Sequence, residues 1–173
     1  MAGHLLVVYG SWAGSSAEVA EEIGHALSDG DTMVDIMPAK QVKNVETYDA
    51  FVIGSAIHAG RLHPDIVSFV DQHKTLLLQK HVAYFVVCLT MKDDSEENRC
   101  KVEAYLDELR STAPQINPVS TGLFAGSMIY KNIPFALKLI VKAMKVGEGD
   151  FRDWDVIRDW AKQLKGLLLD HKV

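Results

Sequence analysis

Small and hydroxyl-bearing residues fill the stretch Ser11-Trp12-Ala13-Gly14-Ser15-Ser16, which follows the first apolar run of the chain. Glycine lets the main chain close around an anion, and the hydroxyls of Ser11, Ser15 and Ser16 are hydrogen-bond donors. A helix that begins here would add unpaired backbone N–H groups and the positive end of its dipole. Because no lysine or arginine occurs in the first 39 residues, a phosphate would be held by N–H and O–H dipoles alone.

The spacing of the glycines excludes the two best-known phosphate loops. A P-loop requires G-x-x-x-x-G-K-S/T and a dinucleotide loop requires G-x-G-x-x-G, whereas this chain has Gly10-x-x-x-Gly14. A phosphate cradle is therefore one interpretation of the stretch. An ordinary strand–helix turn with a serine N-cap is the other.

The elements that must position this stretch alternate between strand and helix, a pattern typical of a parallel sheet covered on both faces. Apolar runs predict strands over 4–9, 32–37, 50–54, 82–89 and 116–123. Helices are expected over 15–28 with Gly30 as the capping residue, from Pro64, over 94–110, over 134–146 and from Asp153. The sequence thus predicts an α/β fold with a five-stranded parallel sheet and an additional C-terminal helix.

Three of the predicted loops belong to one edge of that sheet. In a doubly wound sheet of strand order 2-1-3-4-5, the first and third strands are neighbours at the point where the order reverses. Ligands of such sheets bind outside the carboxyl ends of these strands. We therefore expect the loops over 11–16, 55–61 and 89–94 to converge on one site.

The composition of the whole chain excludes several classes of protein. A length of 173 residues suits a single domain, and the net charge of −5 argues against a nucleic-acid binder. Two cysteines without metal-ligand spacing predict neither a metal site nor a disulfide framework, as expected in a reducing cytosol. Strand-like sequence near Met1 and the lack of a long uncharged apolar run predict a cytoplasmic protein without a signal peptide or a membrane span.

In this order of elements, the stretch Tyr9-Gly10-Ser11-Trp12-Ala13-Gly14-Ser15-Ser16 resembles the FMN-phosphate loop of flavodoxins, whose pattern is S/T-x-T-G-x-S/T. Ser11, Gly14 and Ser16 match that pattern. Ala13 stands where threonine is usual, so one hydroxyl donor is missing.

A second segment, Tyr48-Asp49-Ala50-Phe51-Val52-Ile53-Gly54-Ser55, resembles the third strand of the same family and the start of its flavin-flanking loop. The resemblance covers the whole predicted sheet. It implies a single flavodoxin-like domain over 1–173, with a doubly wound sheet and FMN as the cofactor.

The resemblance also implies which residues surround the cofactor. The phosphate would be held by the first loop, through Ser11, Trp12, Ala13, Gly14, Ser15 and Ser16. The flavin edge would meet backbone groups of the second loop and residues of the third, namely Ser55, Ala56, Ile57, His58 and Gly60, then Leu89 and Thr90.

Two side chains of this site leave alternatives open. Trp12 either lies over the cofactor or caps the surface of its loop. His58 is the candidate catalytic residue, because imidazole can stack on a flavin ring or transfer protons near neutral pH, and its alternative is a polar loop histidine. His63, next to Pro64, fits a helix start, and Cys88 fits a small apolar residue of a buried strand.

A narrower resemblance, to the menaquinone-dependent protoporphyrinogen oxidases, rests on three segments that occur in the same order. These are Val52-Ile53-Gly54-Ser55-Ala56-Ile57-His58-Ala59-Gly60, then Lys138-Leu139-Ile140-Val141-Lys142-Ala143-Met144 followed by Gly147-Glu148, and then Asp153-Trp154-Asp155. The resemblance implies that a porphyrinogen is oxidised with FMN and that the electrons pass to a membrane quinone.

The third loop bears on the choice between an oxidase and an electron carrier. Residues 89–97 contain no aromatic side chain, so one flavin face would stay open to a second substrate. This favours an oxidase over a sealed carrier, and a soluble flavodoxin-type electron carrier is the alternative. A receiver-like domain without flavin would need an acidic cluster after the first strand, where Tyr9-Gly10-Ser11 supplies none.

Three lysines, Lys138, Lys142 and Lys145, share one face of the otherwise apolar helix predicted over 134–146. One interpretation is an interfacial helix that rests on anionic lipid, at the inner face of the membrane, or docks an acidic partner. The other is a solvated face on a packed helix. The expected partners are thus a redox protein or a quinone, and a homodimer is compatible with the sequence.

Overall fold

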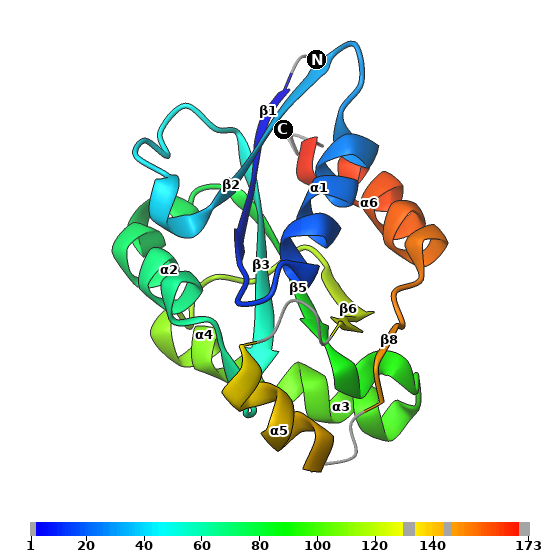
Figure 1. Ribbon diagram of the computed structural model, residues 1–173. Helices are drawn as coiled ribbons and strands as arrows, with labels where there is room; N and C mark the ends of the chain where they lie inside the picture. Colours follow the sequence, from blue (N-terminus) through cyan, green and yellow to red (C-terminus); the bar gives the residue numbers. More distant parts are fainter. Residues whose placement is uncertain (1–2, 130–133, 144–146, 170–173) are drawn as a thin grey trace.

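The computed structural model describes residues 3–129, 134–143 and 147–169, and a parallel sheet lies at its centre (Figure 1). The main strands lie in the order β2-β1-β3-β5-β6, and each neighbouring pair is parallel. The short strand β4 pairs with β3 outside this path, so the predicted 2-1-3-4-5 order is confirmed. The strands of this sheet are β1 (Gly3–Gly10), β2 (Thr32–Pro38), β3 (Ala50–His58), β4 (Arg61–Leu62), β5 (His81–Cys88) and β6 (Thr121–Ala125).

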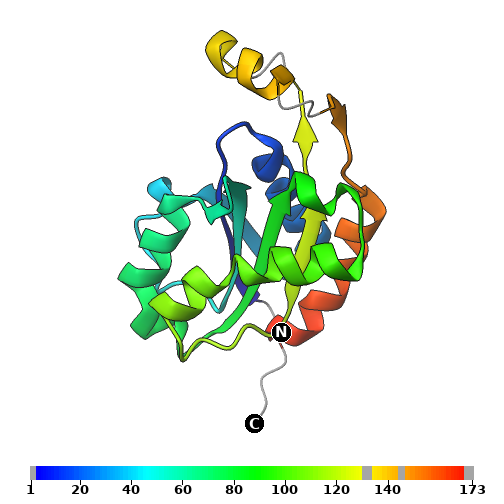
Figure 2. The same cartoon turned by 90° about the horizontal axis from the view of Figure 1, so that it is seen from below.

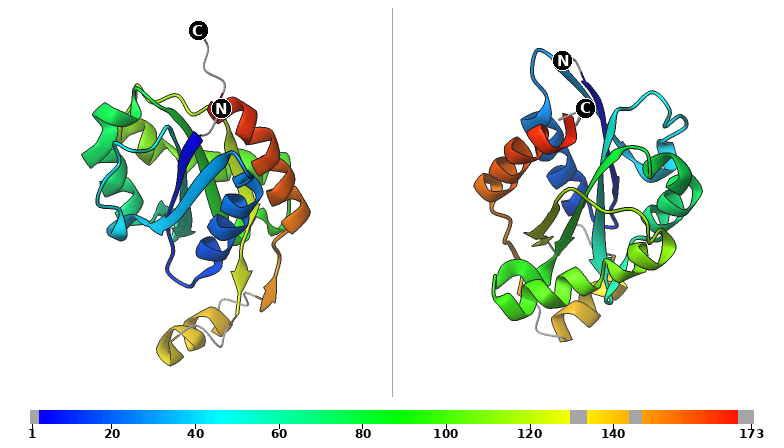
Figure 3. Two further views of the ribbon diagram at one scale, coloured as in Figure 1. Left: turned by 90° about the horizontal axis from the view of Figure 1, so that it is seen from above. Right: turned by 180° about the vertical axis from the view of Figure 1, so that it is seen from behind.

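Helices cover both faces of the sheet, as the two views of Figure 3 show. One face carries α1 (Ser15–Leu27) and α6 (Trp154–Leu169). The other carries α2 (Pro64–Leu77), α3 (Glu96–Ala104) and α4 (Asp107–Thr112). Strand side chains alternate between the two cores, so Leu5 packs toward α1 and α6, whereas Leu6 packs toward α2 and α4. This sandwich fixes the sheet edge from which the predicted loops project.

A segment between β6 and α6 extends beyond the carboxyl edge of the sheet, as Figure 2 shows. It contains β7 (Ser127–Met128), α5 (Phe135–Ala143) and β8 (Gly149–Asp150), and β7 pairs with β8 in antiparallel fashion. We call these elements the arm. The predicted helix over 134–146 is confirmed as far as Ala143, and Lys145 lies outside the described residues.

Two strand boundaries differ from the sequence predictions. β3 continues past residue 54 to His58, where we expected a loop, because its last residues pair with β4 in a hairpin. The strand expected over 116–123 is assigned only from Thr121. Pro118 has no N–H for a ladder, and the first bond to β5 runs from Val119 N to Val82 O at 2.8 Å.

Two helix boundaries also differ. The helix expected over 94–110 is divided into α3 and α4, because the N–H groups of Tyr105 and Leu106 bond three residues back, to Val102 O and Glu103 O, which tightens the turn. α1 ends at Leu27 with Ser28 as its C-cap, so the prediction that Gly30 caps it is wrong. The carboxylate of Asp29 closes this turn instead, by accepting bonds from the N–H groups of Asp31 and Thr32.

Candidate functional site

The turn between β1 and α1 is closed by its own first serine. Ser11 Oγ accepts a hydrogen bond of 3.0 Å from the N–H of Gly14. Gly14 is the N-cap of α1 and has φ 91°, in the left-handed region that disfavours a side chain. No described atom lies within 4 Å of the place where a Gly14 Cβ would be. The N-cap is therefore Gly14 and not a serine, and open space lies at this end of α1.

The first turn of α1 leaves backbone donors for a ligand. Its first intrahelical hydrogen bond runs from Glu18 N to Gly14 O at 3.1 Å, so the N–H groups of residues 15–17 have no partner one turn back. Ser16 is buried at 1% exposure. Ser15 Oγ accepts a bond of 3.2 Å from the N–H of Ser127, in the arm. The hydroxyl proton of Ser15 is not used in that contact and can be donated elsewhere.

The second predicted loop is a tight hairpin between β3 and β4. Ile57 pairs with Leu62 and His58 pairs with Arg61, which leaves Ala59 and Gly60 as the two turn residues. Their φ values are 50° and 75°, and a two-residue hairpin turn with both φ positive matches the twist of its strands. Ala59 adopts this conformation without being glycine, so the turn is strained at a position next to His58.

Ser55 ties this hairpin to the start of α2. Its hydroxyl donates to Ala56 O at 2.8 Å and accepts from His63 N at 2.8 Å. Because Ser55 is 2% exposed, its side chain serves the fold, and only backbone groups nearby are available to a ligand. His63 is the N-cap of α2 and accepts at Nδ1 from the N–H of Asp65, so its predicted place at a helix start is confirmed.

Aromatic rings join the first loop to the hairpin. The Trp12 ring lies 4.3 Å from the His63 ring and 5.5 Å from the His58 ring, measured between centroids. A Cβ on Gly10 would lie 2.7 Å from His63 Cβ, so glycine is required for His63 to pack against β1. Burial lowers the pKa of His63, while the nearby Asp65 carboxylate partly opposes this. Trp12 remains half exposed, so part of its side chain is open to the surroundings of the site.

The third loop begins where β5 ends at Cys88. Leu89 and Thr90 are half-buried in a short 3₁₀ turn, Leu89–Lys92, whose Met91 is buried at 4% exposure. Burial raises the pKa of the Cys88 thiol, which keeps it protonated and suits the apolar role expected for it. The Lys92 ammonium lies 5.3 Å from the centre of the Phe151 ring, next to the arm.

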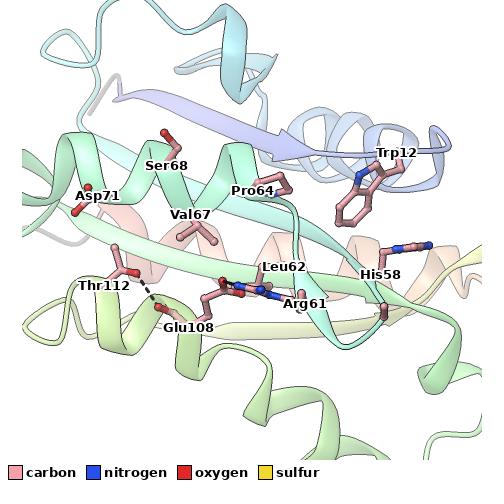
Figure 4. A pocket seen from close by; sticks show the side chains of 11 residues that line it. Trp12, His58, Arg61, Leu62, Pro64, Val67, Ser68, Asp71, Glu108 and Thr112 are labelled. Carbon is pink, nitrogen blue, oxygen red and sulfur yellow. Dashed lines mark hydrogen bonds and ion pairs between the residues drawn. The ribbon is translucent and has the colours of Figure 1, made fainter.

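A groove of about 800 Å³ runs from Trp12 and His58 along the seam between α2 and α4, as Figure 4 shows. Arg61 crosses the seam and donates from Nη2 to Glu108 Oε1 at 2.8 Å. The volume of the groove is within the range of small-molecule sites. Among the described residues, those lining the groove include Trp12, His58 and Ala59 but not the serines of the first loop. The groove thus adjoins the predicted phosphate site without containing it.

Arg152 is a residue of this region that sequence reasoning missed. It lies between β8 and α6, and its guanidinium donates to Glu18 in the first turn of α1 and to Asp150, at 2.6 Å from Nη2 to Oδ2. The chain separates Arg152 from Glu18 by 134 residues, and no pattern in the sequence pairs them. Only the antiparallel return of the arm brings them together.

The predicted loops do converge on one edge of the sheet. Gly10 pairs with Ser55, and Ala56 pairs with Val87, so the three loops follow neighbouring strands at the same level. Within residues 3–129, 134–143 and 147–169, no helix is long and apolar enough to cross a membrane. The same residues contain no cluster of three or more His, Cys, Asp or Glu side chains suited to a metal ion.

Comparison with known proteins gives a family for this arrangement. A family model described as a flavodoxin domain matches residues 6–155, which is most of the chain. The chain belongs to the flavodoxin domain family. Comparison of this flavodoxin domain with curated proteins gives no match.

Solved flavodoxin structures share the fold of this flavodoxin domain at low sequence identity. Oxidised flavodoxin 1 from Bacillus cereus has a TM-score of 0.58 and 14% identity, over 98% of this chain and 99% of its own. A flavodoxin from the domain Archaea has a TM-score of 0.55 and 16% identity, over 95% and 98% of the two chains. A flavoprotein in complex with FMN from Lactobacillus acidophilus has a TM-score of 0.51 and 19% identity, over 70% and 93%. At these identities the likeness shows the fold.

Membership of the flavodoxin family supports FMN as the cofactor, and the first loop fits its phosphate. The left-handed Gly14 leaves an open space in front of α1, and the N–H groups of residues 15–17 adjoin it. Ser11 and Ser15 add hydroxyls at the same turn, Ala13 adds none, and Ser16 is buried, so it offers its N–H and not its side chain. The residues present therefore suit an anion held mainly by helix N–H groups.

Proposed function

We propose that this chain binds FMN at the carboxyl edge of its sheet, as a single domain over residues 1–173, and uses it to transfer electrons. The observation that carries the proposal is the turn before α1, where Gly14 at φ 91° leaves open space in front of free helix N–H groups. The flavin supplies the redox chemistry once it is bound. The protein binds it, orients it and limits the access of water.

Each predicted site residue has a part in this proposal. The phosphate is bound by the N–H groups of residues 15–17 and by the hydroxyls of Ser11 and Ser15. Ala13 and Gly14 line the space with main chain, and Ser16, whose side chain is buried, contributes its N–H. The flavin edge lies along the hairpin and the third loop, against backbone groups of Ser55, Ala56, Ile57, His58 and Gly60 and against Leu89 and Thr90. Trp12 covers the region between the phosphate loop and the hairpin.

His58 is the residue that we propose to hold or move a proton at the site. It is exposed at the end of β3, next to the strained turn at Ala59, and its ring lies 5.5 Å from that of Trp12. An exposed imidazole at this place can pass a proton between solvent and the site.

For the substrate, we favour a porphyrinogen, with the electrons passed to a quinone. Each quinone takes up two electrons and two protons and becomes a quinol, so three quinones balance the six electrons and six protons that leave one porphyrinogen on its way to the porphyrin. Two features support this choice. The third loop places no aromatic side chain over the flavin, since its turn consists of Leu89, Thr90, Met91 and Lys92.

The arm is the second feature. Large apolar side chains on α5 face outward, with Phe135 77%, Leu139 58% and Ile140 55% exposed. Lys138 and Lys142 lie on the same helix, which contains no acidic residue in a chain of net charge −5. An apolar face with cationic side chains suits an anionic lipid surface, where a quinone is dissolved. Peripheral contact with a membrane is therefore part of the proposal.

A flavodoxin-type electron carrier is the second candidate function, and the family match supports it equally. A carrier needs a protein redox partner and turns over no small substrate. The test is an assay of protoporphyrinogen oxidation by the FMN-loaded protein with menaquinone in detergent. Turnover well above that of free FMN supports the oxidase, whereas turnover equal to that of free FMN contradicts it and leaves the carrier.

A further inference from the structure

Arg152 is almost fully enclosed although it carries a permanent charge. Its side chain is 5% exposed. The guanidinium lies between the carboxylates of Glu18 and Asp150, and its central carbon is 4.5 Å from the centre of the Trp154 ring. These contacts hold the pKa of Arg152 above its usual range, with the bond to Asp150 as the largest cause. The cation is therefore fixed at one place beside the first turn of α1.

The carboxylate of Glu18 lies close to the proposed phosphate site, so a cation paired with it changes the charge that a phosphate would meet. The N–H of Glu18 bonds to Gly14 O at 3.1 Å, so Glu18 stands one turn after the N-cap of the helix that would hold the phosphate. A carboxylate in a first helical turn is favourable for the helix itself. The same negative charge repels a phosphate dianion at that N-terminus. Since residues 1–39 contain no lysine or arginine, a cation to offset it must come from elsewhere in the chain.

We propose that Arg152 is a positioning residue for the phosphate end of the cofactor, which acts by neutralising Glu18 and fastening the base of the arm to α1. This inference rests on the proposed binding of FMN. No lysine or arginine lies near the phosphate loop in the sequence. Arg152, which is 134 residues after Glu18, supplies the positive charge beside that loop. Arg152 touches Glu18 and Asp150, and its effect on the phosphate is transmitted through Glu18.

The base of the arm is tied to α1 on both of its strands. Asp150, which binds Arg152, belongs to β8. Ser127, whose N–H donates to Ser15 Oγ, belongs to β7. Because both ties end at the first turn of α1, affinity for a phosphate at that turn depends on the arm being in this position.

A neighbouring arginine provides a matched control. Arg158 also bridges α1 to the C-terminal part of the chain, since it donates to Glu22 Oε1 at 2.8 Å and to Asp155 Oδ1 at 2.7 Å. Glu22 lies one turn further along α1 than Glu18, away from the N-terminus. Loss of Arg158 also removes an ion pair between α1 and the C-terminal part of the chain, but without a charge change at the phosphate loop.

The experiment compares the binding of FMN and of riboflavin, which lacks the phosphate, to wild type, Arg152→Gln, Arg152→Lys, Glu18→Gln/Arg152→Gln and Arg158→Gln. Dissociation constants come from the quenching of flavin fluorescence. We expect Arg152→Gln to weaken FMN binding by about 5-fold, the effect of one charge near a helix N-terminus, with riboflavin unchanged. Arg152→Lys keeps the charge, and the double variant also makes residue 18 neutral, so both should bind FMN within about 2-fold of wild type. Arg158→Gln should likewise bind FMN within about 2-fold of wild type.

Equal weakening of FMN and riboflavin binding by Arg152→Gln, or no weakening of either, overturns the inference, because the arginine would then serve the fold alone. The same holds if the double variant binds FMN as weakly as Arg152→Gln does. If Arg152→Gln does not fold, Glu18→Gln alone gives the test, because it removes the repelling charge and keeps Arg152: FMN binding should tighten by about 5-fold with riboflavin unchanged, and unchanged FMN binding overturns the inference. A wild-type protein that binds neither flavin contradicts the proposed function itself, an outcome separate from these.

Discussion

The hydroxyl of Ser15, the first residue of α1, accepts a hydrogen bond of 3.2 Å from the backbone N–H of Ser127, 112 residues later in the chain. The contact joins the phosphate loop to the base of the arm. Because the Ser15 oxygen is occupied as an acceptor, its proton is directed away from Ser127 and is available to an anion. One hydroxyl can therefore serve both the fold and the cofactor.

Replacing Ser15 by alanine removes both of these roles. We expect Ser15→Ala to lower the free energy of unfolding by about 1 kcal/mol, because the N–H of Ser127 loses its acceptor. We also expect FMN affinity to fall by about 10-fold, the loss of one hydrogen bond to a charged group. Urea denaturation and flavin fluorescence titration measure the two effects. Riboflavin, which has no phosphate, is the control ligand, and a loss of riboflavin affinity equal to that of FMN would argue against a phosphate contact.

Gly14 tests the backbone of the same loop. At φ 91° a side chain is strained, so we expect Gly14→Ala to destabilise the turn by about 1–2 kcal/mol and to weaken FMN binding. Gly30→Ala is the matched control, since Gly30 also has open space around a Cβ but no positive φ. Calorimetry and FMN titration on both variants give the comparison. Equal effects of the two substitutions would mean that the left-handed N-cap is not needed.

For Ala59 we predict a gain in stability on substitution, the opposite of the effect expected at Gly14. Its φ of 50° is one that glycine adopts at less cost, so Ala59→Gly should raise the free energy of unfolding by about 0.5–1 kcal/mol. Ala56→Gly, in the extended part of the same strand, should lower it by a similar amount. Urea denaturation of both variants decides the point. A destabilised Ala59→Gly would show that the hairpin turn is not strained.

His63 makes stability depend on pH. Burial lowers its pKa below the ordinary 6.5, so below that pH the unfolded chain binds a proton more readily than the folded one. The contribution of His63 to stability is therefore complete above pH 6.5 and is lost as the pH falls through its folded pKa. We expect His63→Asn, which keeps a capping side chain, to lose less stability than wild type between pH 7.5 and about 5. If urea denaturation shows that His63→Asn and wild type lose the same stability over this pH range, the pH dependence comes from other groups.

The exposed apolar face of the arm predicts binding to lipid. Leu139→Asp should reduce co-sedimentation with anionic vesicles by about 10-fold or more, since burial of one leucine side chain contributes about 1.5–3 kcal/mol. Leu78→Asp is the control, because Leu78 is also a large exposed apolar residue, 44% exposed, but ends α2. Vesicles of neutral lipid test the role of Lys138 and Lys142. If both variants co-sediment with anionic vesicles to the same extent as wild type, contact through the arm is contradicted.

The sequence was sufficient for the sheet and for the loops that follow its strands. Apolar runs and helix starts such as Pro64 depend on neighbours in the chain, and they predicted the alternating strands and helices. The strand order and the convergence of the three loops followed from the doubly wound sheet that this alternation indicated. The hairpin after β3 was not predicted, because it depends on pairing of Ile57 and His58 with a two-residue strand of weak pattern. Pairing of that kind is decided by tertiary contacts.

The electrostatics of the site were the part that sequence reasoning could not give. No lysine or arginine lies near the loop over 11–16 in sequence, because residues 1–39 contain neither. Arg152 reaches Glu18 only because the arm returns to β8 beside α1, a contact between residues with no shared motif. Likewise, Trp12 and His63 face each other because Gly10 leaves room for the histidine.

The most direct test of FMN binding is titration of the purified protein, stripped of any flavin, with FMN while flavin fluorescence and the visible spectrum are recorded. Binding of one FMN per chain, much tighter than that of riboflavin and weakened by Gly14→Ala, is the predicted result. A protein that leaves the fluorescence and the spectrum of added FMN unchanged would contradict the proposal that the turn before α1 is a cofactor site.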